Sequence, residues 1–261
     1  MLATTAIFLA FPLLSAAYSR LDLIILSFFR GDAEVGWYSA AYRIIDFAAF
    51  LPAALAGAAL PALSALSSTG DRLPTADSIF GRLIEITIPG AFLGMLLAPQ
   101  LVSIFGSDFA PAAPALVILL GAGIFLFVHH VAGTMLIALG RERELTRIVA
   151  WATALNLALN LATVPFWGYL GAALATVVTE AAILYWCKCS LDQALPGALR
   201  VKEAVWLLAV GAAAAGLAWM AAGTPIGKLA VFAAVYLPGY YLWRGHRRNS
   251  RRALEPFEAA A

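Results

Sequence analysis

The sequence predicts an all-α protein, a polytopic membrane helix bundle of about eight transmembrane helices. Two observations lead to this prediction. Hydrophobic residues make up 62% of the 261 residues, charged residues only 12%, and the mean hydropathy is +0.87, whereas about one quarter of a soluble domain is charged. The apolar residues also form long unbroken runs that lack the period-two alternation of a membrane barrel. The composition excludes a soluble domain, a disordered chain, a coiled coil and a disulfide-rich secreted fold.

Eight apolar segments are long enough to cross the hydrocarbon core of a bilayer, which takes about 20 helical residues. Short dividers with turn-forming residues, such as Arg30-Gly31-Asp32 and Phe166-Trp167-Gly168, separate these segments. The expected spans are 3–29, 36–66, 83–105, 112–139, 148–166, 169–187, 204–222 and 226–243.

The distribution of basic residues predicts the orientation of the spans. Thirteen lysines and arginines lie in the loops 67–82, 140–147 and 188–203 and in the tail 244–261, and only Arg30 and Lys228 lie in the alternate loops. An excess of lysine and arginine marks the cytoplasmic side of a membrane. We therefore expect both termini, including the basic tail, in the cytoplasm.

Prolines interrupt two of the predicted spans. Pro52 and Pro61 lie in the second span, and Pro89 and Pro99 lie in the third. Proline removes a backbone donor and kinks a helix. Broken helices around a polar site are a device of alternating-access transporters.

Four ionisable side chains fall inside the first two spans, where each costs at least a few kcal/mol unless it meets water or a partner. These are Arg20 and Asp22 in the first span and Arg43 and Asp46 in the second. Because the connecting loop is short, the two helices are expected to be antiparallel neighbours, so that all four groups reach a similar depth.

The spacing of these residues predicts which of them share a face. Arg43 and Asp46 share one at i,i+3, together with Ser39 and Tyr42. Arg20 and Asp22 are two residues apart, so at most one of them faces that stripe, and Tyr18 could join it. Two interpretations stay open and are not exclusive: a partly cationic cavity wall for an anionic or sugar-like headgroup, or structural salt bridges that hold the helix hairpin together.

Other polar residues occur farther along the chain. His129 and His130 are adjacent and point about 100° apart, so they cannot both serve one site. Asn156 and Asn160 form an i,i+4 pair on the fifth span, and Thr176, Thr179 and Glu180 lie on the sixth. Hydrogen bonds between these neighbouring spans are expected, and Glu180 is in addition a candidate cavity residue.

The sequence has no nucleophile–base constellation, phosphate loop or metal-ligand spacing, and no predicted loop is long enough for a catalytic domain. The two cysteines, Cys187 and Cys189, are too few for a disulfide framework or a zinc site. The net charge of +2 gives no reason to expect nucleic-acid binding. We therefore expect no enzyme activity, no cofactor and no metal.

Two groups of motifs stand out in the chain. The first group is Arg20-Leu-Asp-Leu-Ile-Ile-Leu-Ser-Phe-Phe29, then Gly31-Asp32, then Glu34-Val-Gly-Trp-Tyr-Ser-Ala-Ala-Tyr-Arg43, then Leu60-Pro-Ala-Leu-Ser64. The second group is Asn156-Leu-Ala-Leu-Asn160, Pro165, Gly168-Tyr-Leu-Gly-Ala-Ala-Leu-Ala-Thr176 and Glu180. Both groups resemble the polysaccharide transporter family, the O-antigen and oligosaccharide-lipid flippases of the multidrug/oligosaccharidyl-lipid/polysaccharide exporter superfamily.

The resemblance implies a particular organisation of the chain. Family members have two six-helix lobes, and both groups of motifs belong to the second lobe. The sequence is therefore expected to hold a six-helix C-terminal lobe at 1–187, two additional transmembrane helices at 188–243 and a basic tail at 244–261. The N-terminal lobe is expected to be missing, in agreement with the abrupt apolar start at Leu2, and would come from the same chain or from a separate one.

The resemblance also implies a function. A lipid-linked oligosaccharide would cross a hydrophilic cavity between the lobes, in the bacterial cytoplasmic membrane, for the synthesis of surface polysaccharide such as the O-antigen of lipopolysaccharide. Arg20 and Arg43 would meet its phosphates, with Asp22, Tyr42, Asp46 and Glu180 as further cavity candidates. The alternatives are a multidrug or cation exporter of the same fold and a non-transporting membrane partner of glycan-assembly proteins.

Overall fold

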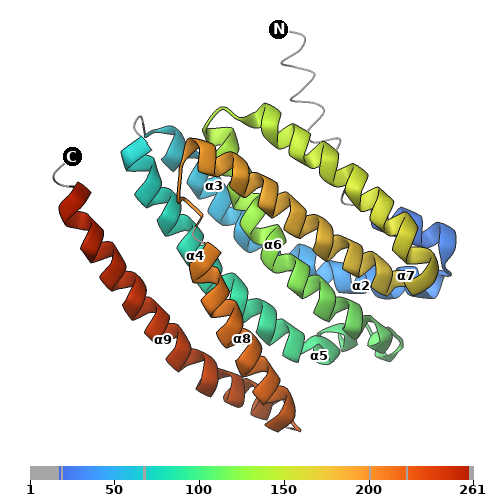
Figure 1. The fold of residues 1–261 in the computed structure, drawn as a ribbon. Helices are drawn as coiled ribbons and strands as arrows, with labels where there is room; N and C mark the ends of the chain where they lie inside the picture. The colour runs from blue at the N-terminus through green and yellow to red at the C-terminus, as the bar shows by residue number, and fades with distance from the viewer. Residues whose placement is uncertain (1–17, 19, 67–68, 200, 222, 259–261) are drawn as a thin grey trace. The chain divides into compact units, whose positions relative to one another are not determined.

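The computed structural model describes residues 18, 20–66, 69–199, 201–221 and 223–258. Within these residues the chain is helical and forms no strand, which confirms the predicted all-α class (Figure 1). The expected first span lies outside the described residues except at its end, where residues 20–29 are helical. The labelled helices are α2 (Asp32–Ala48), α3 (Phe50–Ser64), α4 (Thr69–Leu96), α5 (Ala98–Ser103), the 3-10 helix η1 (Ser107–Ala112), α6 (Ala113–Ala138), α7 (Glu142–Ala194), α8 (Val201–Ala221) and α9 (Pro225–Glu258).

The chain divides into two compact units. Unit 1 consists of Met1–Thr87 and Ala98–Leu199, and unit 2 consists of Ile88–Leu97 and Arg200–Ala261. Helix α4 contributes to both. Every polar site described below lies within unit 1.

Helix α6 is the centre of unit 1. It packs against α7, α3, α2, α5 and η1, and 14 of its 26 residues are buried. Its sequence is apolar on all sides, as expected for a helix surrounded by others. Small residues let its neighbours approach closely: a Cβ added to Gly133 would lie 3.2 Å from Leu145 Cδ1 of α7.

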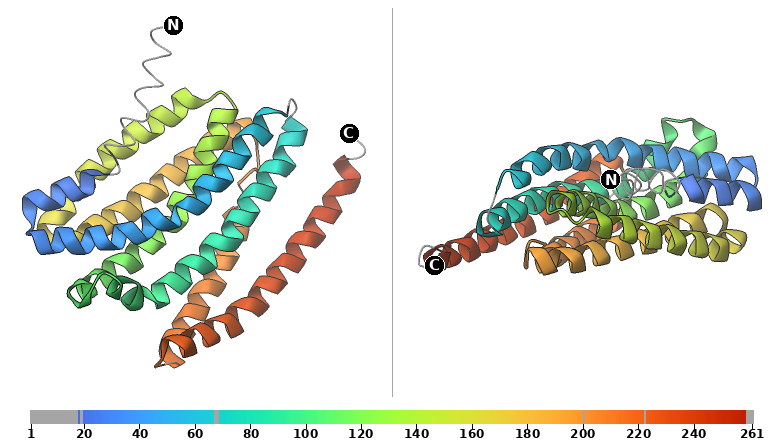
Figure 2. Two further views of the ribbon diagram at one scale, coloured as in Figure 1. Left: turned by 180° about the vertical axis from the view of Figure 1, so that it is seen from behind. Right: turned by 90° about the horizontal axis from the view of Figure 1, so that it is seen from above.

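Helix α7 is a helical hairpin rather than one continuous rod. Its 53 residues are interrupted at Gly168, whose φ of 55° and ψ of −137° are not helical. The two arms of α7 lie side by side in Figures 1 and 2. Thr163 Oγ1 donates a hydrogen bond to the carbonyl oxygen of Gly171, 3.1 Å away across the turn. The two arms coincide with the predicted spans 148–166 and 169–187, and the break falls in the divider predicted between them.

The predicted proline breaks occur in both helices, although only one proline of each pair is responsible. Helix α2 ends at Ala48 and α3 begins at Phe50, directly before Pro52, whose missing N–H and bulky ring disrupt the preceding turn. Helix α4 ends at Leu96, before Pro99 in α5. Pro61 lies inside α3, and Pro89 lies inside α4.

The dividers on the basic side are shorter than expected. The divider 67–82 is helical from Thr69, and 188–203 is helical up to Ala194 and again from Val201. Helix α4 is 28 residues long, more than a bilayer crossing needs. Its first turn, which includes the turn-forming residues Gly70 and Asp71, therefore need not lie in the hydrocarbon core.

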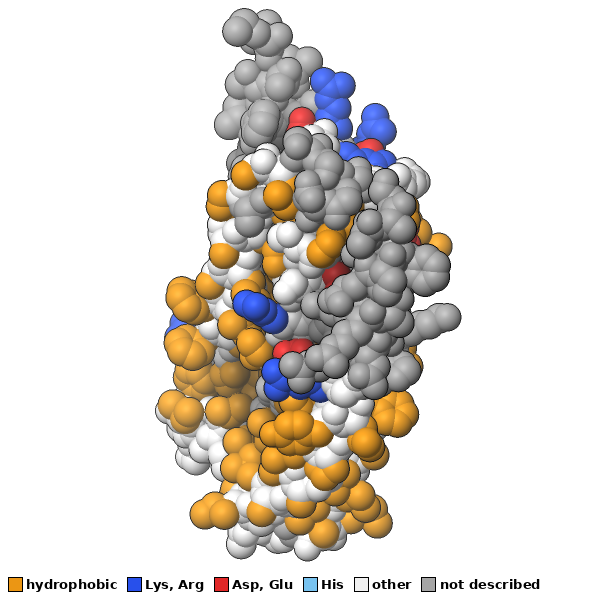
Figure 3. All heavy atoms as spheres, turned by 90° about the vertical axis from the view of Figure 1, so that its left-hand side faces the viewer, with side chains coloured by type: hydrophobic (Ala, Val, Ile, Leu, Met, Phe, Trp, Pro, Cys, Tyr) orange, Lys and Arg blue, Asp and Glu red, His pale blue; other side chains and the backbone are white. Residues whose placement is uncertain are grey.

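Five helical stretches among the described residues are long and apolar enough to cross a membrane: Asp32–Pro61, Arg72–Leu96, Ser107–Ala138, Glu142–Ala194 and Ala204–Ala221. The fourth contains both arms of α7. Together with the apolar surface in Figure 3, where charged side chains gather near one end and about half-way along, this describes a multi-pass membrane protein.

Unit 2 contains an antiparallel pair formed by α8 and α9. Glycines provide its closest contacts, since a Cβ on Gly239 would lie 2.5 Å from Val210 Cγ1 and one on Gly211 would lie 2.4 Å from the ring of Phe92. Along α9, Phe232 and Tyr236 stack with ring centroids 5.2 Å apart. Helix α9 continues to Glu258, so most of the predicted tail is helical.

Candidate functional site

Asp22 is buried in unit 1 and is bonded to a tyrosine. Its side chain lies in the helix over 20–29 and is 4% exposed. The hydroxyl of Tyr38, on α2, donates a short hydrogen bond to Asp22 Oδ2, and the backbone N–H of Leu23 donates to Oδ1 at 2.9 Å. The same hydroxyl lies 3.3 Å from Thr176 Oγ1 on the second arm of α7. The Tyr38 hydroxyl therefore connects the helix that carries Asp22, α2 and the second arm of α7.

Glu180 is a second buried carboxylate, on the second arm of α7, and is 1% exposed. The hydroxyl of Tyr18 donates to its Oε1 at 2.8 Å. Its Oε2 is in short contact with His129 Nε2 on α6. Both carboxylate oxygens are therefore engaged by side chains from other helices.

Amide and hydroxyl groups continue this polar core along α7. Asn156 Nδ2 on the first arm donates to Thr179 Oγ1 on the second arm at 3.4 Å. Asn160 Nδ2 donates to Asn156 Oδ1 at 3.0 Å. The expected i,i+4 amide pair and a hydrogen bond between the two spans are thus both present.

The other predicted residues of the first two spans face outward. Arg20, Arg43 and Asp46 are exposed. Tyr42 is half-buried, and its ring centroid lies 5.7 Å from that of Tyr38. The structure thus separates the candidates into buried carboxylates, Asp22 and Glu180, and exposed charged groups.

Arg43 lines a pocket on the outward face of α2. The pocket has a volume of about 200 Å³ and is lined by Gly36, Ser39, Ala40, Arg43, Phe105 and Phe109. Small residues one helical turn apart form its base, and two phenylalanine rings with centroids 6.0 Å apart stand beside them. A cation, a hydroxyl and two aromatic rings suit an anionic group carried on a sugar or lipid.

In the part of the chain that it describes, the structure does not contain the two salt bridges that were one interpretation of the four charged groups. Among the described residues, none of the ion pairs joins Arg20, Arg43, Asp22 and Asp46 to one another. The first helix is joined to α2 by the Asp22–Tyr38 hydrogen bond instead. Tyr38 was not among the predicted site residues, although its position four residues before Tyr42 places both side chains on one face of the helix.

A clamp at one end of unit 1 holds the turn of α7. Arg30 Nη2 donates to the carbonyl oxygen of Pro165 at 3.1 Å, and Glu34 Oε2 accepts the backbone N–H of Tyr169 at 3.0 Å. Arg30 and Glu34 also pair with each other at 3.8 Å. Gly168 lies against this clamp, because a Cβ there would be 2.0 Å from Glu34 Oε2. From the sequence, Arg30 was expected only as a residue of the divider between the first two spans, and its part in this clamp was not predicted.

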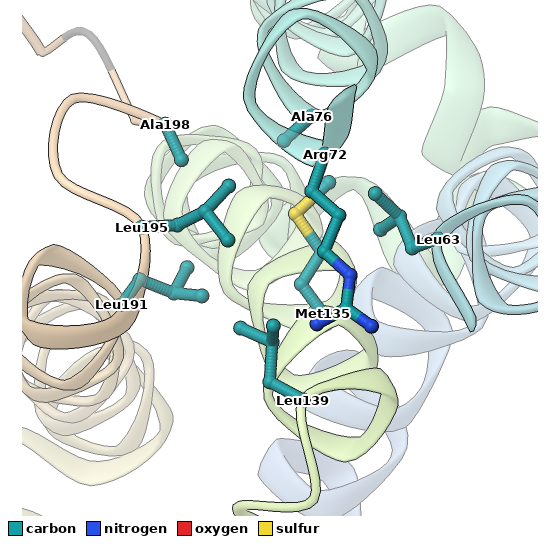
Figure 4. A pocket seen from close by; sticks show the side chains of 8 residues that line it. All are labelled: Leu63, Arg72, Ala76, Met135, Leu139, Leu191, Leu195 and Ala198. Carbon is teal, nitrogen blue, oxygen red and sulfur yellow. The ribbon is translucent and has the colours of Figure 1, made fainter. Parts of the chain in front are cut away.

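The opposite, basic end of unit 1 is held by arginines. Arg141 Nε donates to Glu144 Oε1 at 2.7 Å, and its Nη2 donates to Gln193 Oε1 at 2.8 Å. Arg72 Nε donates to the carbonyl oxygen of Leu66 at 2.8 Å. Figure 4 shows Arg72 in a crevice whose other lining residues are Leu63, Ala76, Met135, Leu139, Leu191, Leu195 and Ala198. With a volume of about 10 Å³, the crevice has room for one water molecule.

This fold, with a polar core between its helices, is that of a multi-pass membrane protein. Lipid II flippase MurJ in an inward closed conformation matches it with a TM-score of 0.74 and 14% sequence identity, over 88% of this chain and 51% of that one. The match confirms the predicted fold.

The curated relatives are archaeal, and no family model matches the chain. The probable low-salt glycan biosynthesis flippase Agl15 of Haloferax volcanii is 30% identical over 168 residues, which cover 63% of this chain and 36% of the relative. The probable flippase AglR of the same organism is 29% identical over 171 residues, covering 62% and 36%. The uncharacterised membrane protein MJ1068 of Methanocaldococcus jannaschii is 26% identical over 162 residues, covering 60% and 32%.

The chain thus spans about a third of the length of the curated relatives that it matches. In sequence it resembles two probable flippases, one of them named for glycan biosynthesis, and in fold it resembles a lipid II flippase. These matches confirm the resemblance to flippases of the multidrug/oligosaccharidyl-lipid/polysaccharide exporter superfamily that the motifs predicted.

Proposed function

We propose that this chain forms one lobe of a flippase that moves a lipid-linked oligosaccharide across a cytoplasmic membrane for surface glycan synthesis. The main support for the proposal is the pocket at Arg43. Arg43 is an exposed cation on a helical stretch that is long and apolar enough to cross a membrane, and two phenylalanine rings from another part of the chain line the same pocket. The names of two relatives, both flippases and one of them assigned to glycan biosynthesis, support the same class of cargo.

The charge of the pocket favours a diphosphate as the group that enters it. A guanidinium binds phosphate oxygens through two parallel hydrogen bonds. The rings of Phe105 and Phe109 offer apolar faces against which a sugar ring can pack. Arg20, exposed at the end of the adjacent helix, is a second phosphate partner in this proposal.

Asp22 and Glu180 have a different role in this proposal. Both are buried and hydrogen-bonded within the bundle. We propose that they hold the helices behind the pocket, while Arg20, Tyr42, Arg43 and the exposed Asp46 meet the headgroup. A second lobe, from the same or a separate chain, would complete the cavity, in agreement with the match to about half of the lipid II flippase.

Binding of a polyprenyl diphosphate that carries one sugar tests the proposal. The purified protein in lipid nanodiscs is titrated with this lipid, and the same titration is done with Arg43→Ala. A charge-assisted hydrogen bond contributes about 1.5–3 kcal/mol, so we expect the variant to bind roughly 10- to 150-fold more weakly.

Arg143→Ala is the matched control, since Arg143 is an exposed arginine outside the pocket, and its affinity should stay at the wild-type value. Equal affinity of Arg43→Ala and wild type would remove Arg43 from the site. Binding of a lipophilic cation without binding of the diphosphate lipid would instead favour the exporter.

A further inference from the structure

The geometry points to a proton-binding site inside unit 1, made of Glu180 and His129 with the hydroxyl of Tyr18 as a partner that can reverse its hydrogen bond. The site uses none of the pocket residues that the proposed function assigns to phosphate, and the inference does not depend on that function. Its ligand is a single proton, and His129, whose side chain is 14% exposed, is the less buried member of the pair.

Across the described ranges of the chain, Glu180 and His129 form a pair that is isolated from other charged groups. Glu180 is 1% exposed, and its ion pair among the described residues is with His129 alone. The other titratable or charged groups of this cluster are Tyr18, Arg20 and Asp22 of the first helix, Tyr42 of α2, His130 of α6 and Cys187 of α7. His130 is exposed, and Arg20 lies beside Asp22 rather than in an ion pair with Glu180.

The number of protons on the pair decides its charge. With one shared proton, the pair is neutral overall, either as carboxylate and imidazolium or as carboxylic acid and imidazole. When that proton leaves, the Glu180 carboxylate can accept hydrogen bonds from the Tyr18 hydroxyl and from the imidazole N–H of His129, so its charge is not left without partners. Gaining another proton would leave a buried cation, which is costly in a medium of low dielectric constant. Histidine is the side chain that exchanges protons in the range between about pH 5 and 8.

Tyr18 is a hydrogen-bond partner that can adapt to either protonation state of Glu180. An arginine beside Glu180 would donate hydrogen bonds only, and would hold the carboxylate permanently charged. A phenol donates to a carboxylate, as Tyr18 does at 2.8 Å, and it accepts from a carboxylic acid after its O–H rotates. Glu180 can therefore take a proton on Oε1 without losing a hydrogen bond. The arrangement suits a carboxyl group that changes its protonation state.

Infrared difference spectroscopy of the purified protein in nanodiscs tests the inference without any measurement of lipid transport. Spectra are recorded between about pH 5 and 8, the range of histidine titration, and the C=O stretching band of a protonated carboxyl is followed. We expect a titrating band in the wild type, its loss in Glu180→Gln, and a shift of its frequency in Tyr18→Phe, since the acid then lacks its hydroxyl partner.

Asp32→Asn is the matched control, because it removes an exposed carboxyl of α2 that has no role in either proposal and should leave the band unchanged. Identical difference spectra for the wild type and Glu180→Gln would overturn the inference. Should Glu180→Gln not fold, the milder Tyr18→Phe decides: an unchanged band frequency there would equally refute the site. A failure of the Arg43 binding test would leave these spectra, and the proton site, unaffected.

Discussion

The turn at Gly168 offers the sharpest test of how unit 1 is held together. Replacing Gly168 by alanine introduces two separate costs. The φ of 55° with a ψ of −137° is a backbone conformation almost confined to glycine, which costs an L-residue about 1–3 kcal/mol. The new Cβ would also lie 2.0 Å from Glu34 Oε2, so the carboxylate must leave the position from which it accepts the N–H of Tyr169.

The second cost follows from that hydrogen bond. A hydrogen bond to a charged group contributes about 1.5–3 kcal/mol, and Glu34 is only 24% exposed. We therefore expect Gly168→Ala to reduce the free energy of unfolding by about 2.5–6 kcal/mol in total. Reversible unfolding in mixed micelles of a mild detergent and sodium dodecyl sulfate, followed by circular dichroism, measures it.

Two comparisons separate the costs. Gly140 has a similar φ of 71° but no atom within 4 Å of an added Cβ, so Gly140→Ala should cost only about 1–2 kcal/mol. In a Glu34→Ala background, the penalty of Gly168→Ala should fall to the backbone cost alone, about 1–3 kcal/mol, because the clashing carboxylate is gone. An equal penalty for Gly168→Ala in the wild-type and Glu34→Ala backgrounds would refute the clamp.

Two further substitutions probe the polar core and the packing of the α7 arms. Tyr38→Phe removes the hydroxyl that donates to Asp22, and we expect a loss of about 1.5–3 kcal/mol in the same unfolding assay; an unchanged midpoint would mean that the carboxyl finds another partner. Gly171→Ala would place a Cβ 2.7 Å from the backbone oxygen of Thr163, which cannot shift cheaply, so we expect the yield of monodisperse protein in size-exclusion chromatography to fall severalfold. Gly123→Ala, in α6 with open space around it, should leave that yield unchanged; similar yields for both variants would contradict the close packing of the arms.

Most of the helix layout was predictable because it follows from the bilayer. A helix must be about 20 apolar residues long to cross it, and turn residues mark where it ends. The break at Gly168 and the kink before Pro52 were therefore visible in the sequence. The length of α4 was not, since residues 69–82 are polar enough to resemble a loop, and a helix that extends beyond the membrane needs no apolar face.

The candidate site was predictable only in part, for a geometric reason. Sequence spacing tells which residues share one helix face, as for Arg43 and Ser39, which line one pocket. It does not tell which helix lies opposite. Tyr38 and His129 are partners of Asp22 and Glu180 because α2 and α6 bring them there. An arginine was one expected partner of Asp22, and hydrogen bonds within α7 were expected for Glu180, whereas the structure supplies a phenol from another helix to both.

The clamp at Gly168 also has a consequence for the order of biogenesis. Glu34 and its donor partner, the N–H of Tyr169, are 135 residues apart in the chain. At synthesis rates of 5–20 residues per second, Glu34 leaves the ribosome roughly 7–27 s before Tyr169 does. The clamp can therefore form only after the turn of α7 has been synthesised, which makes it a late contact in the assembly of unit 1.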